Sequence, residues 1–373
     1  VCAVAGPTTR TRPTAPVRTR LAQDGGMRVP TRIAAAAAVL TLAVTLAACG
    51  SDEVTTGDGA GDVATVEPAT PSVSPPLSGR PDGTVIPGVA GTALAQAGST
   101  VAVLGTDGTV RLHTAPGAAD TPLPRDTEVT DAAALTADGD GFIVATPAQL
   151  SRIGADGAVT QIAGEQGPVL SVAVTDDDRI LVGTDDGHLR VFGRDGGLQR
   201  DIHEFVRVDE ILVAPKSSDV AGQVVVVDRA QSMIAPIDID TGERKAALRA
   251  GNGIAEATVD SYGRVLATGT ADNELLGFYG QPIVMRFRFP VSPGPYALTW
   301  DDTQQLLWVS TTGDNQAIAY DLSTGEPRER GRIATVGQVS AMTADPATGM
   351  LYVLSERGDG LQAVPRHTPD GDR

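Results

Sequence analysis

The chain has 373 residues, with 46 acidic against 29 basic side chains, a net charge of −17 and 3% aromatic residues. This acidic balance argues against a nucleic-acid partner, because binding to phosphates needs clustered lysine and arginine. The two cysteines, Cys2 and Cys49, can form neither a disulfide framework nor a zinc–thiolate site. The composition therefore favours a protein without a resident cofactor.

Residues 27–48 have the organisation of a secretory signal peptide. A short basic region precedes the apolar stretch 33–44, and Leu46-Ala47-Ala48 leads directly to Cys49. The apolar stretch is shorter than the roughly 20 residues that span a bilayer. The pattern resembles the lipobox of bacterial lipoproteins, which implies that Cys49 is lipidated and becomes the mature N-terminus. The alternative is a plain transmembrane anchor with an unrelated cysteine.

Two further segments flank this signal. Residues 1–26 are basic and rich in Pro and Thr, and we interpret them as an upstream extension from a misassigned start codon. Removing residues 1–48, which hold six arginines and one acid, changes the net charge from −17 to −22. Residues 49–83 are rich in Pro, Gly and Thr, and such a composition buries too little surface to order itself. We expect this segment to be a disordered tether.

From residue 84 onward, short alternating apolar runs recur between Gly- and Asp-rich turns, which indicates strands rather than helices. One four-stranded unit is predicted over 133–138, 142–145, 150–153 and 158–162, and the next over 172–176, 180–183, 189–192 and 198–202. The other units open near Ala93, Ile211, Ala257, Ala297 and Ala341.

Seven units over residues 84–366 give a spacing of about 40 residues, the length of one β-propeller blade. The predicted fold is all-β: a seven-bladed β-propeller with four-stranded antiparallel blades, followed by a polar tail at 367–373. Six or eight blades are the alternatives. The last unit supplies three strands, so Thr84-Val85-Ile86-Pro87 would add the missing outer strand and close the ring. Closure removes an exposed strand edge.

Two repeats carry a family resemblance. Leu307-Trp308-Val309-Ser310, with the segment 317–326, resembles a YVTN-type propeller repeat, and its Asp-x-x-Thr-Gly-Glu turn returns at 238–243. With the lipobox and the Pro-rich segment, the chain is similar to propeller lipoproteins of high-GC actinobacteria, including the mycobacterial Lpp series. The resemblance implies a monomeric propeller, lipid-anchored at Cys49 on the extracytoplasmic face of the cell membrane. It implies no reaction.

The sequence offers few groups for catalysis. Its four histidines are scattered and include no helical i, i+4 pair, and the serine-elbow and Walker motifs are absent. Acidic turns at 138–141, 176–178, 301–302 and Asp345 fall between first and second strands. They lack the spacing of a calcium-binding loop, so we interpret them as hairpin turns.

The mouth of the central channel is the usual site of a propeller. It is lined by the loops that enter each innermost strand and by the turns between second and third strands. In this register, the candidate ligand-binding residues are Asp131, Asp209, Glu210, Glu256, Tyr296 and Gln338. Converging carboxylates could bind a cation or a polyol, and propellers of the gluconolactonase and paraoxonase type, which are similar in this respect, use such a ring for Ca²⁺. The other interpretation is that these are ordinary loop residues.

The aromatic residues are unevenly distributed. Of six Phe, five Tyr and two Trp, eight lie between Phe278 and Tyr320. In Arg286-Phe287-Arg288-Phe289, strand alternation places both rings on one face and both arginines on the other. Trp300 and Trp308 are candidates for an exposed aromatic platform that contacts a sugar or a partner. Alternatively, the aromatic cluster packs the fifth and sixth blades together.

These features favour a non-enzymatic, envelope-anchored module that binds an envelope protein or glycan through one face of the ring. The first alternative is a Ca²⁺-dependent, lactonase-like hydrolase that uses the carboxylates of the channel mouth. It requires at least three of Asp131, Asp209, Glu210 and Glu256 to surround one point, as a calcium shell demands. The second alternative is a structural scaffold without a small ligand.

Overall fold

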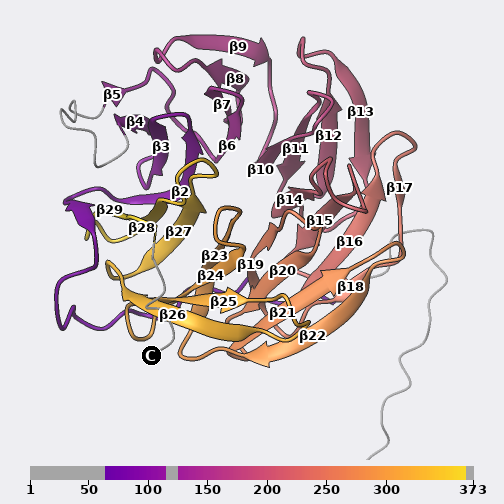
Figure 1. The fold of residues 1–373 in the computed structure, drawn as a ribbon. Coiled ribbons are helices and arrows are strands. Elements are labelled where there is room, and N and C mark those ends of the chain that lie inside the picture. The colour runs from indigo at the N-terminus through magenta and orange to yellow at the C-terminus, as the bar shows by residue number, and fades with distance from the viewer. Residues whose placement is uncertain (1–63, 115–124, 367–373) are drawn as a thin grey trace, which may run out of the picture. The chain divides into compact units, whose positions relative to one another are not determined.

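The computed structural model describes residues 64–114 and 125–366, so the predictions for Cys49, the signal segment and the tail 367–373 lie outside it. Within these residues the protein is all-β, and seven antiparallel sheets form the blades of a propeller (Figure 1). This confirms the predicted fold and the number of blades. In the part of the chain that is described, no helix is long and apolar enough to cross a membrane.

Each blade is numbered in chain order, and its strands run from the channel outward. Blade 1 consists of β2 (Gly91–Ala97), β3 (Thr100–Gly105), β4 (Val110–Thr114) and β5 (Arg125–Asp126). Blade 2 consists of β6 (Ala134–Asp138), β7 (Gly141–Ala145), β8 (Leu150–Ile153) and β9 (Val159–Ala163). Blade 3 consists of β10 (Val169–Val174), β11 (Ile180–Thr184), β12 (His188–Phe192) and β13 (Leu198–His203).

The remaining blades follow the same order. Blade 4 consists of β14 (Glu210–Val213), β15 (Val224–Asp228), β16 (Met233–Asp238) and a split outer strand, β17 (Glu243–Arg244) and β18 (Leu248–Arg249). Blade 5 consists of β19 (Ile254–Val259), β20 (Val265–Gly269), β21 (Glu274–Tyr279) and β22 (Val284–Pro290). Blade 6 consists of β23 (Pro295–Asp301), β24 (Leu306–Thr311), β25 (Gln316–Asp321) and β26 (Arg328–Ala334). Blade 7 consists of β27 (Val339–Ala344), β28 (Leu351–Ser355), β29 (Leu361–Val364) and β1 (Thr84–Ile86).

The hydrophobic core lies between blades rather than in one central mass. Seven clusters of buried apolar side chains each join two neighbouring blades, including blades 7 and 1. The second strands β7, β11, β15, β20, β24 and β28 are buried along their whole length, because neighbouring blades cover both of their faces. Outer strands such as β13 and β26 are largely exposed and polar.

Strands from both ends of the described chain close the ring, as predicted. β1 pairs antiparallel with β29, with Thr84 opposite Ala363 and Ile86 opposite Leu361. The hydroxyl of Ser340 in blade 7 also donates a hydrogen bond of 2.7 Å to the carbonyl oxygen of Gly91 in blade 1. β1 thus covers the outer edge of β29 and completes a four-stranded blade 7.

The repeated Asp-x-x-Thr-Gly-Glu turn connects third and fourth strands in blades 4 and 6. The Asp238 carboxylate accepts hydrogen bonds from the backbone N–H groups of Asp240 and Thr241, at 3.0 and 2.9 Å. Asp321 accepts one from the N–H of Ser323, at 2.8 Å. The motif therefore recurs because an aspartate at this place satisfies the backbone of a tight turn.

The aromatic residues between Phe278 and Tyr320 mostly pack into the cores between blades. Those between blades 5 and 6 are Phe287, Phe289, Trp300 and Tyr320, those between blades 6 and 7 are Tyr296 and Trp308, and Phe278 lies between blades 4 and 5. The prediction of an exposed platform at Trp300 and Trp308 is wrong. Their exposed fractions are 9% and 2%. Phe287 and Phe289 do share the half-buried face of β22, as the alternation predicted. The ring of Phe287 packs on Gly277, where an added Cβ would lie 2.2 Å from a ring carbon. The aromatic side chains thus add large apolar area to three neighbouring interfaces between blades.

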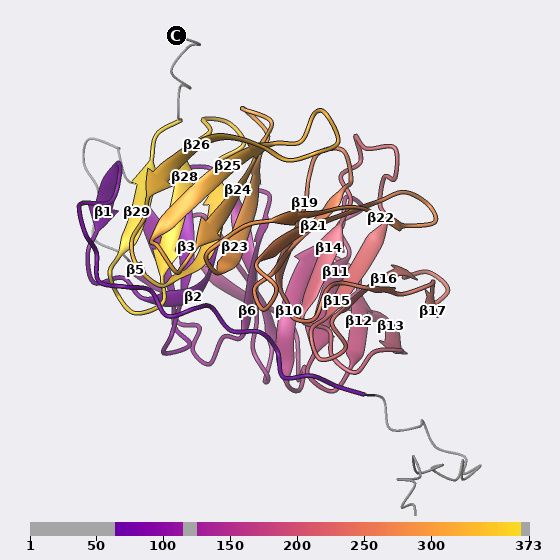
Figure 2. The ribbon, with the colours of Figure 1, turned by 90° about the horizontal axis from the view of Figure 1, so that it is seen from below.

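Part of the predicted tether is ordered on the ring, and this corrects the expectation that the whole of 49–83 lacks structure. We call residues 66–83 the strap. It starts at Val66, whose N–H donates to the carbonyl oxygen of Ala230 at 2.7 Å, and it ends beside Asp82, whose N–H donates to the oxygen of Ala334 at 2.9 Å. Figure 2 shows this indigo segment along one face of the ring before it reaches β1. An extended Pro-rich chain can order here because the loops satisfy its backbone groups.

Candidate functional site

The mouth face of the ring is formed by the loops that enter the innermost strands and by the turns between second and third strands. A cavity of about 380 Å³ opens there, between the inner strands of blades 1 to 5. Apolar side chains of β6, β10 and β14 line one part of it. The charged side chains of this mouth cavity are Arg207, Asp209, Glu210, Arg229 and Glu256.

Arg229 lies at the centre of these charges. Its Nη2 donates to Glu210 Oε1 at 2.5 Å and to Glu256 Oε1 at 2.7 Å. The other carboxylate oxygen of Glu210 accepts a hydrogen bond from the N–H of Ala257 at 2.8 Å. The side chains of Arg229, Glu210 and Glu256 are 17%, 16% and 29% exposed. The guanidinium of Arg229 therefore pairs with two largely buried carboxyl groups from neighbouring blades.

A second pair fixes the loop between blades 3 and 4. Arg207 Nη2 donates to Asp209 Oδ1 at 2.9 Å, and Arg207 also pairs with Asp185. The other oxygen of Asp209 accepts from the backbone N–H of Arg229 at 2.8 Å. The buried Asp228 carboxylate accepts from the N–H groups of Val206 and Arg207, at 2.9 and 3.2 Å. The charged groups of the mouth are thus held in place by backbone contacts.

The electrostatics of the cluster follow from its uneven charge. Burial, reinforced by the nearby charge of Glu256, raises the pKa of Glu210 to about 8, while Arg229 acts in the opposite direction. The two carboxylates raise the pKa of Arg229 well above its usual range, against the effect of burial. Burial also raises the pKa of Tyr296, and Glu256 adds to this effect. Two carboxyl groups share one guanidinium here, and this imbalance together with burial favours a proton on Glu210.

The structure brings together three of the six predicted mouth residues. Asp209, Glu210 and Glu256 line the cavity. Asp131 is exposed and adopts a φ of 56° in the loop before blade 2, outside the cavity lining. Tyr296 packs against the core of blades 6 and 7, and Gln338 contacts the strap.

Sequence reasoning missed the two arginines that organise the site. Arg229 occupies the turn between β15 and β16, and Arg207 precedes Asp209 by two residues in the entrance loop. Both positions belong to the loop classes that line a propeller mouth. A search of those loops for basic as well as acidic side chains would have found them.

The geometry does not support a calcium ring of the gluconolactonase type. Among residues 64–114 and 125–366, no three His, Cys, Asp or Glu side chains are grouped closely enough to hold a metal ion. The Arg229 guanidinium contacts both Glu210 and Glu256, so a cation of the protein already takes their charge. A calcium shell of six to eight oxygens would have to displace it.

The acidic turns and the histidines have structural roles. Asp301 Oδ1 accepts from the N–H of Thr303 at 2.8 Å, and Asp345 Oδ1 from the N–H of Ala347 at 2.8 Å, as expected of hairpin turns. His188 stacks on His203 with ring centroids 4.3 Å apart, and its Nδ1 lies 2.7 Å from Asp201. Among the described residues, these aspartates and the His188–His203 pair each make their contacts within a single blade.

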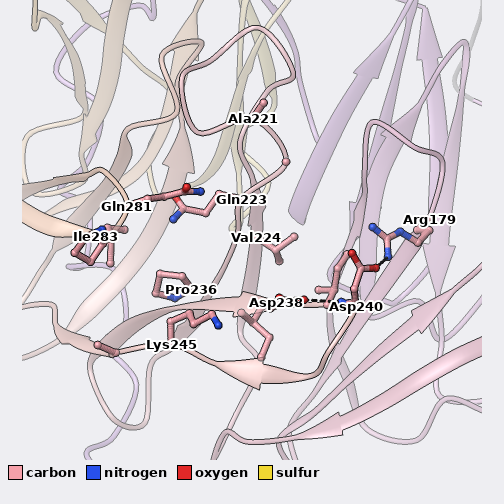
Figure 3. A pocket seen from close by; sticks show the side chains of 15 residues that line it. Arg179, Ala221, Gln223, Val224, Pro236, Asp238, Asp240, Lys245, Gln281 and Ile283 are labelled. Atoms are coloured by element: carbon pink, nitrogen blue, oxygen red, sulfur yellow. Dashed lines mark hydrogen bonds and ion pairs between the residues drawn. The ribbon is translucent and has the colours of Figure 1, made fainter.

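A larger cavity, of about 520 Å³, lies on the opposite face, between blades 4 and 5 and a turn of blade 3 (Figure 3). Pro236 in β16 lacks an N–H, and the outer strand splits into β17 and β18 on either side of it. Charged residues at the rim pair with one another: Arg179 with Asp240 at 2.5 Å, and Lys245 with Glu243 at 2.7 Å. The cavity thus follows from the broken strand, and its charges are already engaged.

Comparisons with known proteins support the fold. No family model matches the chain, and no curated protein matches it. Many solved structures are similar in fold. One is hydrazine synthase of Kuenenia stuttgartiensis, with a TM-score of 0.60 and 13% identity, over 79% of this chain and 99% of that chain. At this level of identity the likeness shows the propeller fold alone.

Proposed function

We propose that this protein is an envelope-anchored lipoprotein whose propeller binds a partner through the mouth face. Cys49 would carry the lipid on the extracytoplasmic face of the membrane, as the lipobox-like sequence and the resemblance to actinobacterial propeller lipoproteins suggest. The observation that supports binding most strongly is the mouth cavity, in which charged groups are preorganised beside apolar side chains.

The chemistry of the cavity suits a hydroxyl-bearing ligand. Glu256 offers an acceptor, and the guanidinium of Arg229 offers donors. The neighbouring Leu135, Leu170 and side chains of β14 offer apolar contact. This combination of a few placed polar groups and apolar lining is typical of sites for sugars or for a side chain of a partner protein. An envelope glycan or an envelope protein is therefore the proposed partner.

The binding proposal is tested with one variant in the cavity and one control. Glu256→Ala removes a cavity acceptor, whereas Asp131→Ala changes an exposed loop acid outside the cavity. A photo-crosslinking residue at Leu135 in cells should capture a partner, and Glu256→Ala should reduce this capture about tenfold. Asp131→Ala should leave it unchanged. Equal capture by all three proteins, or capture only from a probe at Gln281 on the opposite face, would reject the proposed site.

Anchoring is tested separately in a bacterium that processes lipoproteins. The wild-type protein should fractionate with membranes and incorporate labelled palmitate. Cys49→Ser should lose the label and the stable membrane association, because a diacylglycerol anchor needs the thiol. Membrane association that survives this substitution would instead favour a transmembrane anchor.

A further inference from the structure

The strap contacts the ring at several places, including Val66 and Asp82, and its hydrogen bonds are most numerous at Ser74-Pro75. We propose that the mouth face over blades 6 and 7 carries a binding site for an extended Ser-Pro peptide of a partner protein, and that Ser74-Pro75 is its resident intramolecular ligand. The inference deepens the proposed function, since it names a partner class and a second surface for the binding module. This surface adjoins the mouth cavity but shares none of the side chains that line it.

Every polar group of Ser74 is bound by the ring. Its N–H donates to Gln338 Oε1 at 3.0 Å, and its hydroxyl donates to the Thr312 carbonyl oxygen at 2.7 Å. The same hydroxyl accepts from the N–H of Gln338 at 2.7 Å. Arg357 Nη1 donates to the Ser74 carbonyl oxygen at 3.1 Å. Ser74 is only 5% exposed, so its hydroxyl makes these hydrogen bonds shielded from solvent.

The neighbours of Ser74 show what the pocket selects. Asn315 Nδ2 donates to the carbonyl oxygen of Pro75 at 2.9 Å. Val73, by contrast, is 87% exposed. A proline after the serine holds the backbone extended and needs no partner for an N–H. The ring therefore binds the serine hydroxyl and the extended backbone. The exposed side chain before the serine, here Val73, can vary.

The pocket is built by residues in demanding conformations. Gln338 and Asn315 have φ values of 52° and 55°, in the left-handed region that non-glycine residues seldom adopt. Gly337 leaves room for Arg357, because an added Cβ would lie 1.9 Å from Arg357 Nη2. Asp359 holds the same guanidinium at 2.6 Å. The left-handed φ values recur in turns of other blades, as at Ser232 and Asn273, whereas the guanidinium held by Asp359 directly contacts Ser74.

The covalent link makes the strap a strong competitor. Seven residues, 76–82, separate Pro75 from the segment that reaches β1, so the strap acts at an effective concentration in the millimolar range. A peptide added in trans must displace it. Only a partner peptide that has high affinity, or that is itself held near the ring, would then displace the strap from the pocket.

The experiment uses a fluorescent peptide with the sequence of residues 66–80 and the full chain in three forms. Ser74→Ala in the chain removes two hydrogen bonds of the strap but leaves the pocket intact. Val73→Ser is the matched control, because that side chain points away from the pocket. By fluorescence anisotropy, the Ser74→Ala chain should bind the peptide about tenfold more tightly than wild type or Val73→Ser. Adding Arg357→Ala to the Ser74→Ala chain should reverse most of this gain.

A second measurement needs no variant of the chain. Millimolar unlabelled peptide added to the wild-type protein should speed hydrogen exchange of the Ser74 amide, and a peptide with alanine at that position should do so about tenfold less. Exchange in the strands of blades 6 and 7 should stay unchanged. Equal peptide affinity of folded Ser74→Ala and Val73→Ser chains, or exchange at Ser74 that ignores the peptide, would overturn the inference. A negative result here leaves crosslinking at Leu135 unaffected, so the two proposals fail separately.

Discussion

Replacing Arg229 by leucine removes the one cation that serves Glu210 and Glu256 while keeping much of the apolar volume. Breaking a fully buried ion pair costs about 3–5 kcal/mol, because the partner charge stays buried without compensation. The carboxyl groups here are 16% and 29% exposed, and Glu210 can hold its proton. We therefore expect Arg229→Leu to lower the free energy of unfolding by about 2–3 kcal/mol at pH 8.

Urea denaturation followed by circular dichroism measures this loss, and the melting temperature should fall by about 3–5 °C for a ring of this size. The loss should shrink at pH 5, well below the raised pKa of Glu210, where this carboxyl group is neutral in the folded state. Combining Arg229→Leu with glutamine at positions 210 and 256 should recover most of the stability, because no charge then lacks a partner. Equal destabilisation of the single and triple variants would show that packing, not charge, accounts for the loss. An unchanged Arg229→Leu protein would refute the reasoning altogether.

Three further expectations concern the ring. The pKa of Glu210 is raised from 4.5 to about 8, so between these pH values the folded state binds a proton that the unfolded chain has lost. The free energy of unfolding should therefore fall as pH rises through that window, by at most about 1.4 kcal/mol per pH unit. Glu210→Gln should flatten this pH profile, measured by urea denaturation. Gly277→Val places a side chain in the ring of Phe287 and should cost about 1–3 kcal/mol in thermal unfolding, with Phe287→Ala in the same chain recovering part of it. Ser340→Ala removes the hydroxyl bond to Gly91 and should cost about 1 kcal/mol and speed hydrogen exchange where blades 7 and 1 meet; an unchanged rate would mean that β1 closes the ring by itself.

Most of the architecture could be predicted from local sequence. Apolar alternation gave the strands, Gly and Asp gave the turns between them, and the repeat length gave seven blades. The closing role of 84–87 followed from counting strands in the last unit. These features are local because hairpins and blades form between neighbouring segments of the chain.

The candidate site was only half predictable. Register alone placed Asp209, Glu210 and Glu256 at the mouth, but it could not tell which basic side chain would reach them. Arg229 contacts Glu256 from the neighbouring blade, so their pairing depends on how two sheets pack. That packing also raises the pKa of Glu210, since desolvation is a property of the assembled ring.

By itself, the sequence determined a ring of seven repeating blades and an N-terminal region too polar to form a core of its own. Only the tertiary structure decided where part of that region lies, since Ser74 and Gln338 are 264 residues apart in the chain. It likewise decided that Trp300 and Trp308 are buried between blades. The physical reason is the same in each case. The composition of a segment indicates how much apolar surface that segment can bury by itself. The partners of a backbone amide or an indole ring come from distant strands, which only the closed ring brings near.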